Sequence, residues 1–225
     1  MLRRVLFMIS LLALALATTA HGALRSPQVP VSGTALQAFF TSQGQAINVN
    51  TDQLDLQTVS LPADATIQFG APLVPPSSTS TLGIYNAGLG APPLYQVFPG
   101  AASTGWLSLL AFRTAPIRAV VTLFDAGGAF QGSTTYLGAD RSYLGFYLQL
   151  GTGDVLYGQD ARNAGGAKLL AFNATGARAG STWFAWETGA GPGGDFADTI
   201  WLLQYAFAPV AVLRTDWGTL KQRFH

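Results

Sequence analysis

Apolar residues in this chain recur in short runs that are separated by turn-forming residues. The runs are rich in β-branched and aromatic side chains, which is typical of β-strands. Glycine-rich segments such as Asp125–Gly128 and Gly151–Asp154 connect them and supply the positive φ angles that tight turns need. The pattern predicts strands over Leu82–Tyr85, Leu94–Phe98, Trp106–Phe112, Ile117–Phe124, Tyr143–Leu150, Val155–Tyr157, Lys168–Phe172, Thr182–Trp186 and Thr199–Phe207.

The pattern before residue 82 is more mixed. Thr34–Phe40 fits one short helix that the Thr34 side chain is placed to cap. Ala46–Asn50 and Ala65–Phe69 alternate between apolar and polar positions, as strands do. The proline- and serine-rich segment Pro72–Thr81 predicts an irregular connection, either a linker or a long loop. We prefer a loop, because the preceding residues carry too few apolar side chains for a separate core.

Many short strands and few stripes of helical period predict an all-β chain. Regular strands with tight turns favour a β-sandwich or a jelly roll. Ala119–Phe124 is a nearly continuous apolar run, which predicts a strand that is buried on both faces.

The first residues form a different kind of segment. A pair of arginines precedes the apolar run Val5–Ala17, which is too short to span a bilayer but typical of a signal peptide helix. Small residues then predict cleavage between Gly22 and Ala23, with a cut after Ala20 or an uncleaved anchor as alternatives. The sequence therefore predicts a signal peptide over residues 1–22 and an exported protein that is extracellular, at the cell surface or periplasmic.

The remaining chain has the length of one domain, residues 23–208, followed by a tail, residues 209–225. The last twelve residues, Arg214–His225, are more polar and fit a short amphipathic helix, a frayed end or an address for a secretion or anchoring machine. No later apolar run reaches the length of a membrane-spanning helix, so we expect no transmembrane segment in the mature protein.

Charge and reactive side chains argue against several functions. The chain has 12 Lys and Arg against 11 Asp and Glu, and losing two arginines makes the mature form slightly acidic, unlike a nucleic-acid-binding protein. It contains no cysteine, which excludes disulfides and thiolate sites. The two histidines, His21 and His225, lie at the ends of the chain, which disfavours nucleophilic triads and histidine-ligated metals. The sequence predicts a protein that is not an enzyme.

Three carboxylates nevertheless gather around a glycine-rich loop: Glu187, Asp195 and Asp198. Carboxylate and carbonyl oxygens are the ligands of Ca²⁺, which needs about six to eight of them. Ordinary turns, in which the aspartates accept bonds from backbone amides, are a second interpretation. A catalytic pair of Glu187 with Asp195 or Asp198 is a third, although the two carboxylates of a glycosidase normally flank an open cleft.

Several segments together resemble a known family. They are the strands Leu82–Tyr85, Gly145–Leu148 and Lys168–Phe172, the step Trp186–Glu187 and the loop Gly193–Asp198. On these residues the chain from about 80 to 208 resembles the DUF4114 family, a domain of secreted bacterial and adhesin-like proteins. The resemblance implies a β-sandwich with a calcium-binding acidic loop.

The acidic loop departs from the family pattern in three places. Thr188 stands where the family has a second acid, Ala197 where it has asparagine, and Gly191–Gly194 where a further aspartate often precedes the last motif. Fewer oxygen ligands imply a weak calcium site.

These observations predict an exported, non-catalytic binding module of the surface, matrix or adhesion type, with a weak structural calcium site. Its abundant tyrosine, tryptophan, threonine, serine and amide side chains suit a glycan or protein partner. Two alternatives are a carbohydrate-active enzyme that uses Glu187 with Asp195 or Asp198, and a purely structural secreted component that its tail addresses.

Overall fold

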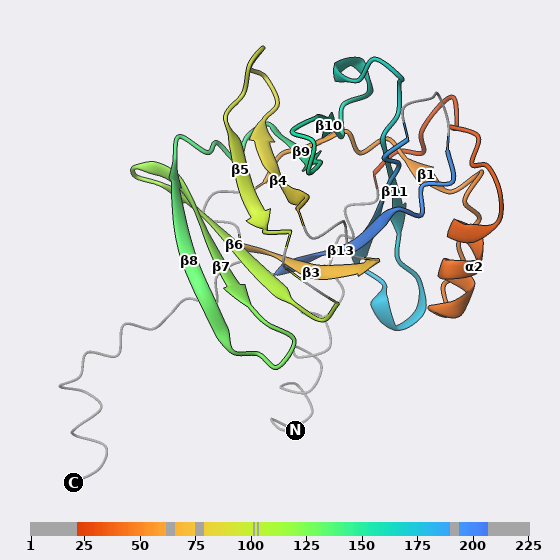
Figure 1. Cartoon of the computed structure of the whole chain (residues 1–225), viewed down its shortest axis with the longest axis horizontal. Helices are drawn as coiled ribbons and strands as arrows, with labels where there is room; N and C mark the ends of the chain where they lie inside the picture. The colour runs from red at the N-terminus through yellow and green to blue at the C-terminus, as the bar shows by residue number, and fades with distance from the viewer. Residues whose placement is uncertain are drawn as a thin grey trace, which may run out of the picture.

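Two antiparallel β-sheets packed face to face form the protein (Figure 1), so the predicted all-β, sandwich-like fold is confirmed. The computed structural model describes residues 22–61, 66–74, 79–100, 102, 104–189 and 194–206. The tail and all of the predicted signal peptide except Gly22 lie outside these residues. Within the described part, no helix is long and apolar enough to cross a membrane.

The large sheet contains eight strands, and three of its seven neighbouring pairs join strands that are not consecutive in the sequence. In spatial order they are β1 (Gln53–Leu54), β11 (Leu169–Asn173), β12 (Ser181–Trp186), β13 (Thr199–Ala206), β3 (Thr66–Val74), β6 (Leu107–Thr114), β7 (Ile117–Phe124) and β8 (Phe130–Leu137). The small sheet has the order β10 (Val155–Tyr157), β9 (Leu144–Gln149), β4 (Thr81–Asn86) and β5 (Leu94–Phe98), and β2 (Thr58–Val59) pairs with β9. Two short 3₁₀ turns, Asp160–Arg162 and Gly176–Arg178, and one α-helix, α2 (Ala35–Ser42), complete the described elements.

Aromatic side chains fill the space between the two sheets. The Trp201 indole stacks between Phe69 and Phe184, with ring centroids 5.0 Å and 4.7 Å away. Phe146, from the small sheet, lies 4.7 Å from Phe184 and joins the two layers. All four side chains are buried, and each contributes roughly 1.5–3 kcal/mol by leaving water.

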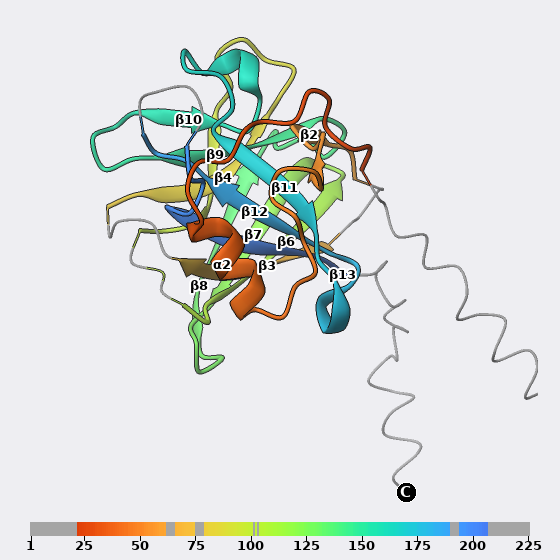
Figure 2. The same cartoon turned by 90° about the vertical axis from the view of Figure 1, so that its right-hand side faces the viewer.

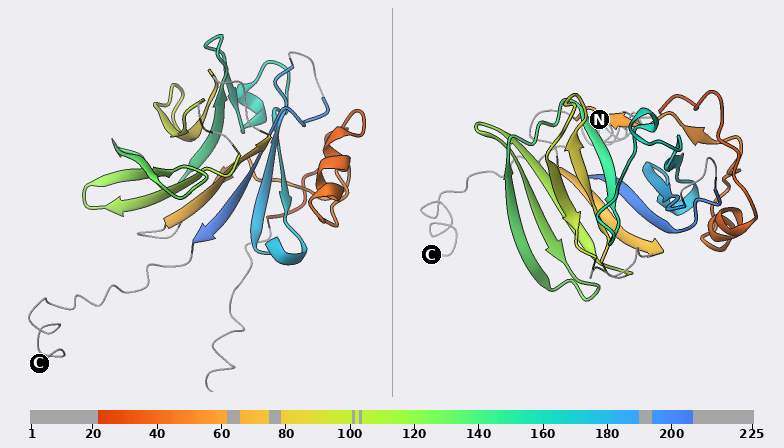
Figure 3. Two further views of the ribbon diagram at one scale, coloured as in Figure 1. Left: turned by 60° about the horizontal axis from the view of Figure 1, so that its bottom comes forward. Right: turned by 45° about the horizontal axis from the view of Figure 1, so that its top comes forward.

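Helix α2 covers the other face of the large sheet over β11, β12 and β13 (Figures 2 and 3). Its buried Phe40 packs edge-on against Phe172 and Trp183, with centroids 5.1 Å and 5.9 Å away. The short helix predicted from residue 34 is therefore confirmed. Thr34 occupies the N-cap position, but its side chain makes no capping hydrogen bond, so that part of the prediction was wrong.

All nine strands predicted beyond residue 80 are present, each within two residues of its predicted limits where the structure describes them. Ala46–Asn50, by contrast, is not a strand. The Gln37 side chain donates to the Ile47 carbonyl oxygen and accepts from the Val49 N–H, at 2.8 Å and 3.2 Å. The Gln37 side-chain amide thus makes the hydrogen bonds with these backbone groups that a neighbouring strand would otherwise make.

Two further expectations need correction. β3 extends to Val74, so the first residues of the predicted irregular segment Pro72–Thr81 are strand, while residues 75–78 lie outside the described part. In β7, only Ala119 and Val121 are buried, and Val120 is half-buried. β7 therefore has one buried face instead of two, since the helix covers a different part of the sheet.

A reciprocal pair of glycine–tyrosine contacts joins β4 to β9. Gly83 lies opposite Tyr147 and Gly145 lies opposite Tyr85 in the register of the two strands. Each tyrosine ring occupies the space that a Cβ on the opposite glycine would take. The two Gly-x-Tyr tripeptides of the sequence, one in each strand, therefore form one packing unit. Burial raises the pKa of Tyr147 to about 12.

On the outer surface, Arg162 closes this unit. Its guanidinium carbon lies 5.3 Å from the centre of the Tyr85 ring and 5.5 Å from that of Tyr157. The Tyr85 hydroxyl donates to the Gln159 side chain at 2.9 Å. Tyr85 is therefore held on both sides and is fully buried.

Candidate functional site

Glu187 holds the two ends of the glycine-rich loop that follows β12. Its Oε1 accepts from the Gly189 N–H at 2.7 Å, and its Oε2 accepts from the Phe196 N–H at 3.2 Å. Phe196 has a φ angle of 52°, a left-handed conformation that side-chain-bearing residues rarely adopt. Gly194 lies so close to the carboxylate that a Cβ there would collide with it. Glu187, which is only 8 % exposed, thus fixes a strained backbone path.

The two aspartates also accept hydrogen bonds from their surroundings. Asp198 Oδ2 accepts from both the N–H and the hydroxyl of Thr188, each at 2.7 Å. Asp195 Oδ1 accepts from the Ala197 N–H at 2.9 Å, which forms a local turn. Each of the three carboxylates therefore accepts a hydrogen bond from a backbone N–H of the same loop region.

The described part of this loop does not form a recognisable calcium site. Both oxygens of Glu187 and one oxygen of each aspartate already accept hydrogen bonds. In the described part of the chain, no group of three or more His, Cys, Asp or Glu side chains is placed to hold a metal ion. Calcium binding with Glu187, Asp195 and Asp198 as ligands stays a prediction, and the hydrogen bonds favour the turn-forming interpretation.

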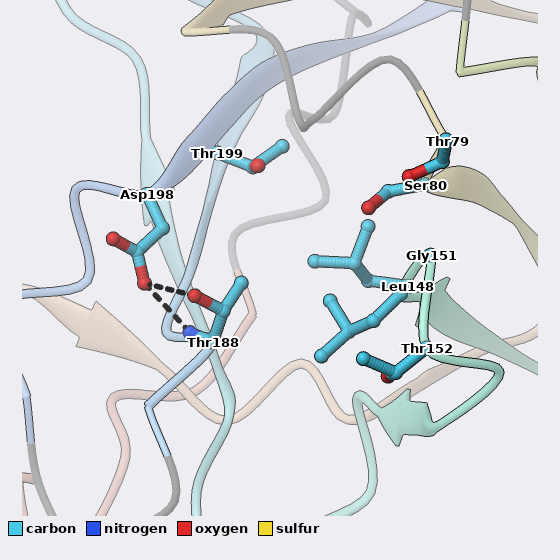
Figure 4. A pocket seen from close by; sticks show the side chains of 9 residues that line it. Thr79, Ser80, Leu148, Gly151, Thr152, Thr188, Asp198 and Thr199 are labelled. Atoms are coloured by element: carbon cyan, nitrogen blue, oxygen red, sulfur yellow. Dashed lines mark hydrogen bonds between the residues drawn. The ribbon is translucent and has the colours of Figure 1, made fainter.

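A pocket of about 470 Å³ opens beside this loop, between the ends of the two sheets (Figure 4). We call it the end pocket. Thr188, Asp198 and Thr199 form its wall on the large sheet, and residues at the start of β4 and the end of β9 form the opposite wall. The described residues that line it are Thr79, Ser80, Leu148, Leu150, Gly151, Thr152, Thr188, Asp198 and Thr199.

Thr199 has an unusual position in this wall. Thr199 is 1 % exposed, and its Oγ1 has no hydrogen-bond partner among the described residues. Thr199 lies opposite Trp186 in the register of β12 and β13, and within the same part of the chain the buried Trp186 indole N–H has no partner either. A buried polar atom without a partner costs about 1–3 kcal/mol, and most proteins avoid it. The pocket wall therefore contains a hydroxyl group, that of Thr199, which forms no hydrogen bond within the described fold.

The end pocket offers one carboxylate for acid–base chemistry. Among its described lining residues, Asp198 is the only ionisable one, and the Glu187 carboxylate faces the backbone of Gly189 and Phe196 instead. A glycosidase needs two carboxyl groups that flank the scissile bond. The pairing of Glu187 with Asp198 as catalytic residues stays a hypothesis, without a shared pocket to support it.

The sequence pointed to Asp198 but not to the pocket around it. Thr79 and Ser80 lie in the segment predicted to be an irregular connection, and Gly151 and Thr152 lie in a turn that looked purely structural. These residues come together only because β4, β9 and β13 end at the same side of the sandwich. No spacing in the sequence signals that meeting.

The fold and the pocket define a β-sandwich with a small polar pocket at one end. Comparisons with models of protein families, with curated proteins and with solved structures find no match. The resemblance to the DUF4114 family accordingly stays a prediction.

Proposed function

We propose that the chain is an exported, non-catalytic binding module of a cell surface or extracellular matrix, which holds part of its ligand in the end pocket. The observation that carries this proposal is the Thr199 hydroxyl, which is buried in the pocket wall without a hydrogen-bond partner in the part of the chain that the structure describes. A ligand that forms a hydrogen bond with this hydroxyl would offset the free energy that the unliganded protein loses by burying the group without a partner. The volume also falls in the range of about 300–1,000 Å³ that small-ligand sites occupy.

The character of the lining supports binding over chemistry. Five of the nine lining residues bear hydroxyl groups, which hydrogen-bond without being ionised at neutral pH. The single carboxylate, that of Asp198, already accepts two hydrogen bonds from Thr188. Such a group orients a ligand well, but it has no second acid or base in the described lining with which to share a proton.

The experiment uses residues 23–225 as a fluorescently labelled protein, which is sedimented with washed host cells and with their extracellular material. We expect the protein to co-sediment. Thr152→Trp, at an exposed position of the pocket rim, should reduce the bound fraction at least tenfold by blocking the pocket.

Thr135→Trp is the matched control, because Thr135 is an exposed threonine on β8 and does not line the pocket. It should bind like the unmodified protein. Equal sedimentation of all three proteins would reject the pocket as the binding site. Mass spectrometry of the protein recovered outside the cell tests the export step, for which we expect an N-terminus at Ala23.

A further inference from the structure

The hydrogen bonds around the end pocket determine which polar atoms remain for a ligand. The Thr188 hydroxyl donates a hydrogen bond to Asp198 Oδ2, and the Thr152 hydroxyl donates one to Asp154 Oδ2, both at 2.7 Å. Each hydroxyl proton is therefore already in a hydrogen bond, and only lone pairs remain for a ligand. On Thr152, one of these lone pairs accepts from the Asp154 N–H at 3.5 Å. Asp198 Oδ1, which has no hydrogen bond among the described residues, is a further acceptor.

Acceptors of this kind require a ligand that donates several hydrogen bonds. Sulfate and carboxylate groups are excluded because they present only acceptors at neutral pH, and phosphate because it would bring about −1.5 to −2 charge beside Asp198. The described lining contains no lysine or arginine that would offset this repulsion.

A ligand with several hydroxyl groups fits better than a cation. Asp198 is exposed, and an ion pair between exposed groups contributes little because water screens it. The Thr199 hydroxyl can both donate and accept, which matches a partner that also does both. Sugar hydroxyls have this property, whereas an ammonium group only donates.

The pocket also provides an apolar surface beside its polar wall. Leu148 in β9 and Leu150 just after it line the pocket, and Figure 4 shows Leu148 across from Thr188 and Asp198. A pyranose ring has hydroxyl groups around its edge and C–H groups on its face, so it can contact both surfaces. Leu148 is fully buried, so half-buried Leu150 is the leucine that an apolar face of the ligand would shield from water.

We propose that the end pocket binds a neutral sugar unit of a glycan, whose hydroxyl groups donate to Asp198 Oδ1 and pair with Thr199 Oγ1. This inference rests on the proposed function and names the chemical class of its ligand.

The test is a binding measurement on residues 23–225 with four neutral trisaccharides: maltotriose, cellotriose, chitotriose and mannotriose. n-Butylamine and acetate serve as a cationic and an anionic probe. Saturation-transfer NMR detects weak binding, and tryptophan fluorescence follows it because Trp186 lies opposite Thr199 in the β-sheet register. We expect at least one trisaccharide to bind, with a Kd that is the same in 50 mM and 500 mM NaCl.

Thr199→Val removes the hydroxyl and keeps the β-branched shape. We expect it to weaken sugar binding at least tenfold without lowering the melting temperature, since the lost hydroxyl has no partner in the fold. Ser108→Ala is the matched control, because Ser108 Oγ is equally buried and unpaired but does not line the pocket. That variant should bind sugar normally.

Different results reject different claims. Salt-sensitive binding of n-butylamine that depends on Thr199, without sugar binding, would overturn the sugar assignment and leave the pocket as the binding site. Failure of all four trisaccharides to bind would also overturn it, while loss of cell binding in Thr152→Trp would still support the proposed function. Sugar binding that Thr199→Val leaves unchanged would place the sugar elsewhere and reject the inference.

Discussion

Replacing Gly145 by alanine should destabilise the protein by about 3 kcal/mol, although the change adds a single methyl group. Its Cβ would lie 2.5 Å from the Tyr85 hydroxyl oxygen and 2.6 Å from the ring carbon Cε1. Tyr85 cannot move aside easily, because Arg162 and Tyr157 pack against its ring and Gln159 accepts a hydrogen bond from its hydroxyl group.

Two routes lead to this magnitude. If the strands shift and keep the ring in place, overpacking of a well-filled site costs about 1–3 kcal/mol. If the ring leaves its site, the protein loses a hydrogen bond, a cation–π contact and an edge-on aromatic contact, each worth about 1 kcal/mol. For a domain of this size, about 3 kcal/mol corresponds to a fall of roughly 6–12 °C in Tm.

The assay is urea denaturation, followed by tryptophan fluorescence and by circular dichroism. Gly90→Ala is the control, because a Cβ on Gly90 would meet no atom within 4 Å. It should change the free energy of unfolding by less than about 0.5 kcal/mol. In a Tyr85→Ala background, Gly145→Ala should cost almost nothing, because the clashing ring is absent. An equal cost of Gly145→Ala in both backgrounds would refute the reasoning, and so would a cost as small as that of Gly90→Ala.

Two further predictions concern ionisable groups. Glu187→Gln should lower the free energy of unfolding by about 1–3 kcal/mol, because the amide group has only one oxygen with which to accept from the Gly189 and Phe196 N–H groups. Urea denaturation measures this, and a stability equal to that of the unmodified protein would contradict the role given to Glu187. Thermal denaturation of the same two proteins tests the predicted calcium site: a rise in Tm in millimolar Ca²⁺ that Glu187→Gln abolishes would establish it, and an unchanged Tm would reject it. Burial raises the pKa of Tyr147 from 10.0 to about 12, so the folded state holds this proton more tightly than the unfolded state. Its contribution to stability is complete below pH 10 and is lost as the pH rises to about 12, a loss of about 3 kcal/mol. Absorbance at 295 nm should show late ionisation of buried tyrosines in the folded protein. Tyr147→Phe should remove one of them, while Tyr85, whose pKa burial also raises, should still ionise late.

The pattern of apolar and polar residues predicted most of the strands because it follows which side chains are buried, and the turn residues marked where the strands end. β12 and β13 are apolar on both faces, since one face meets the small sheet and the other lies under α2, and such runs are easily recognised. β8 was missed for the opposite reason. It is an edge strand, and nearly all of its residues are exposed, including the polar segment Ser133–Thr135, so no periodic burial marks it. Hydrogen bonding in the sheet, and not hydrophobicity, determines its conformation.

The site was less predictable because its polar groups come from separate parts of the chain. The acidic residues were evident from the sequence, but the direction of the Glu187 carboxylate depends on the left-handed turn at Phe196. The missing partner of Thr199 is a property of the packed core, and no sequence pattern records it. The residue types could therefore be anticipated, but their geometry could not.

The position of β13 has a consequence for how the chain folds. This strand pairs with both β12 and β3, so the large sheet separates into two unconnected groups of strands without it. β13 also comes last in the described sequence, and its Trp201 occupies the centre of the aromatic core. A chain that is still being synthesised cannot complete the sandwich until residue 206 has emerged, and pairing between such distant strands is slow. The newly made chain therefore stays open during synthesis, which is the state that the proposed export through a narrow channel would require.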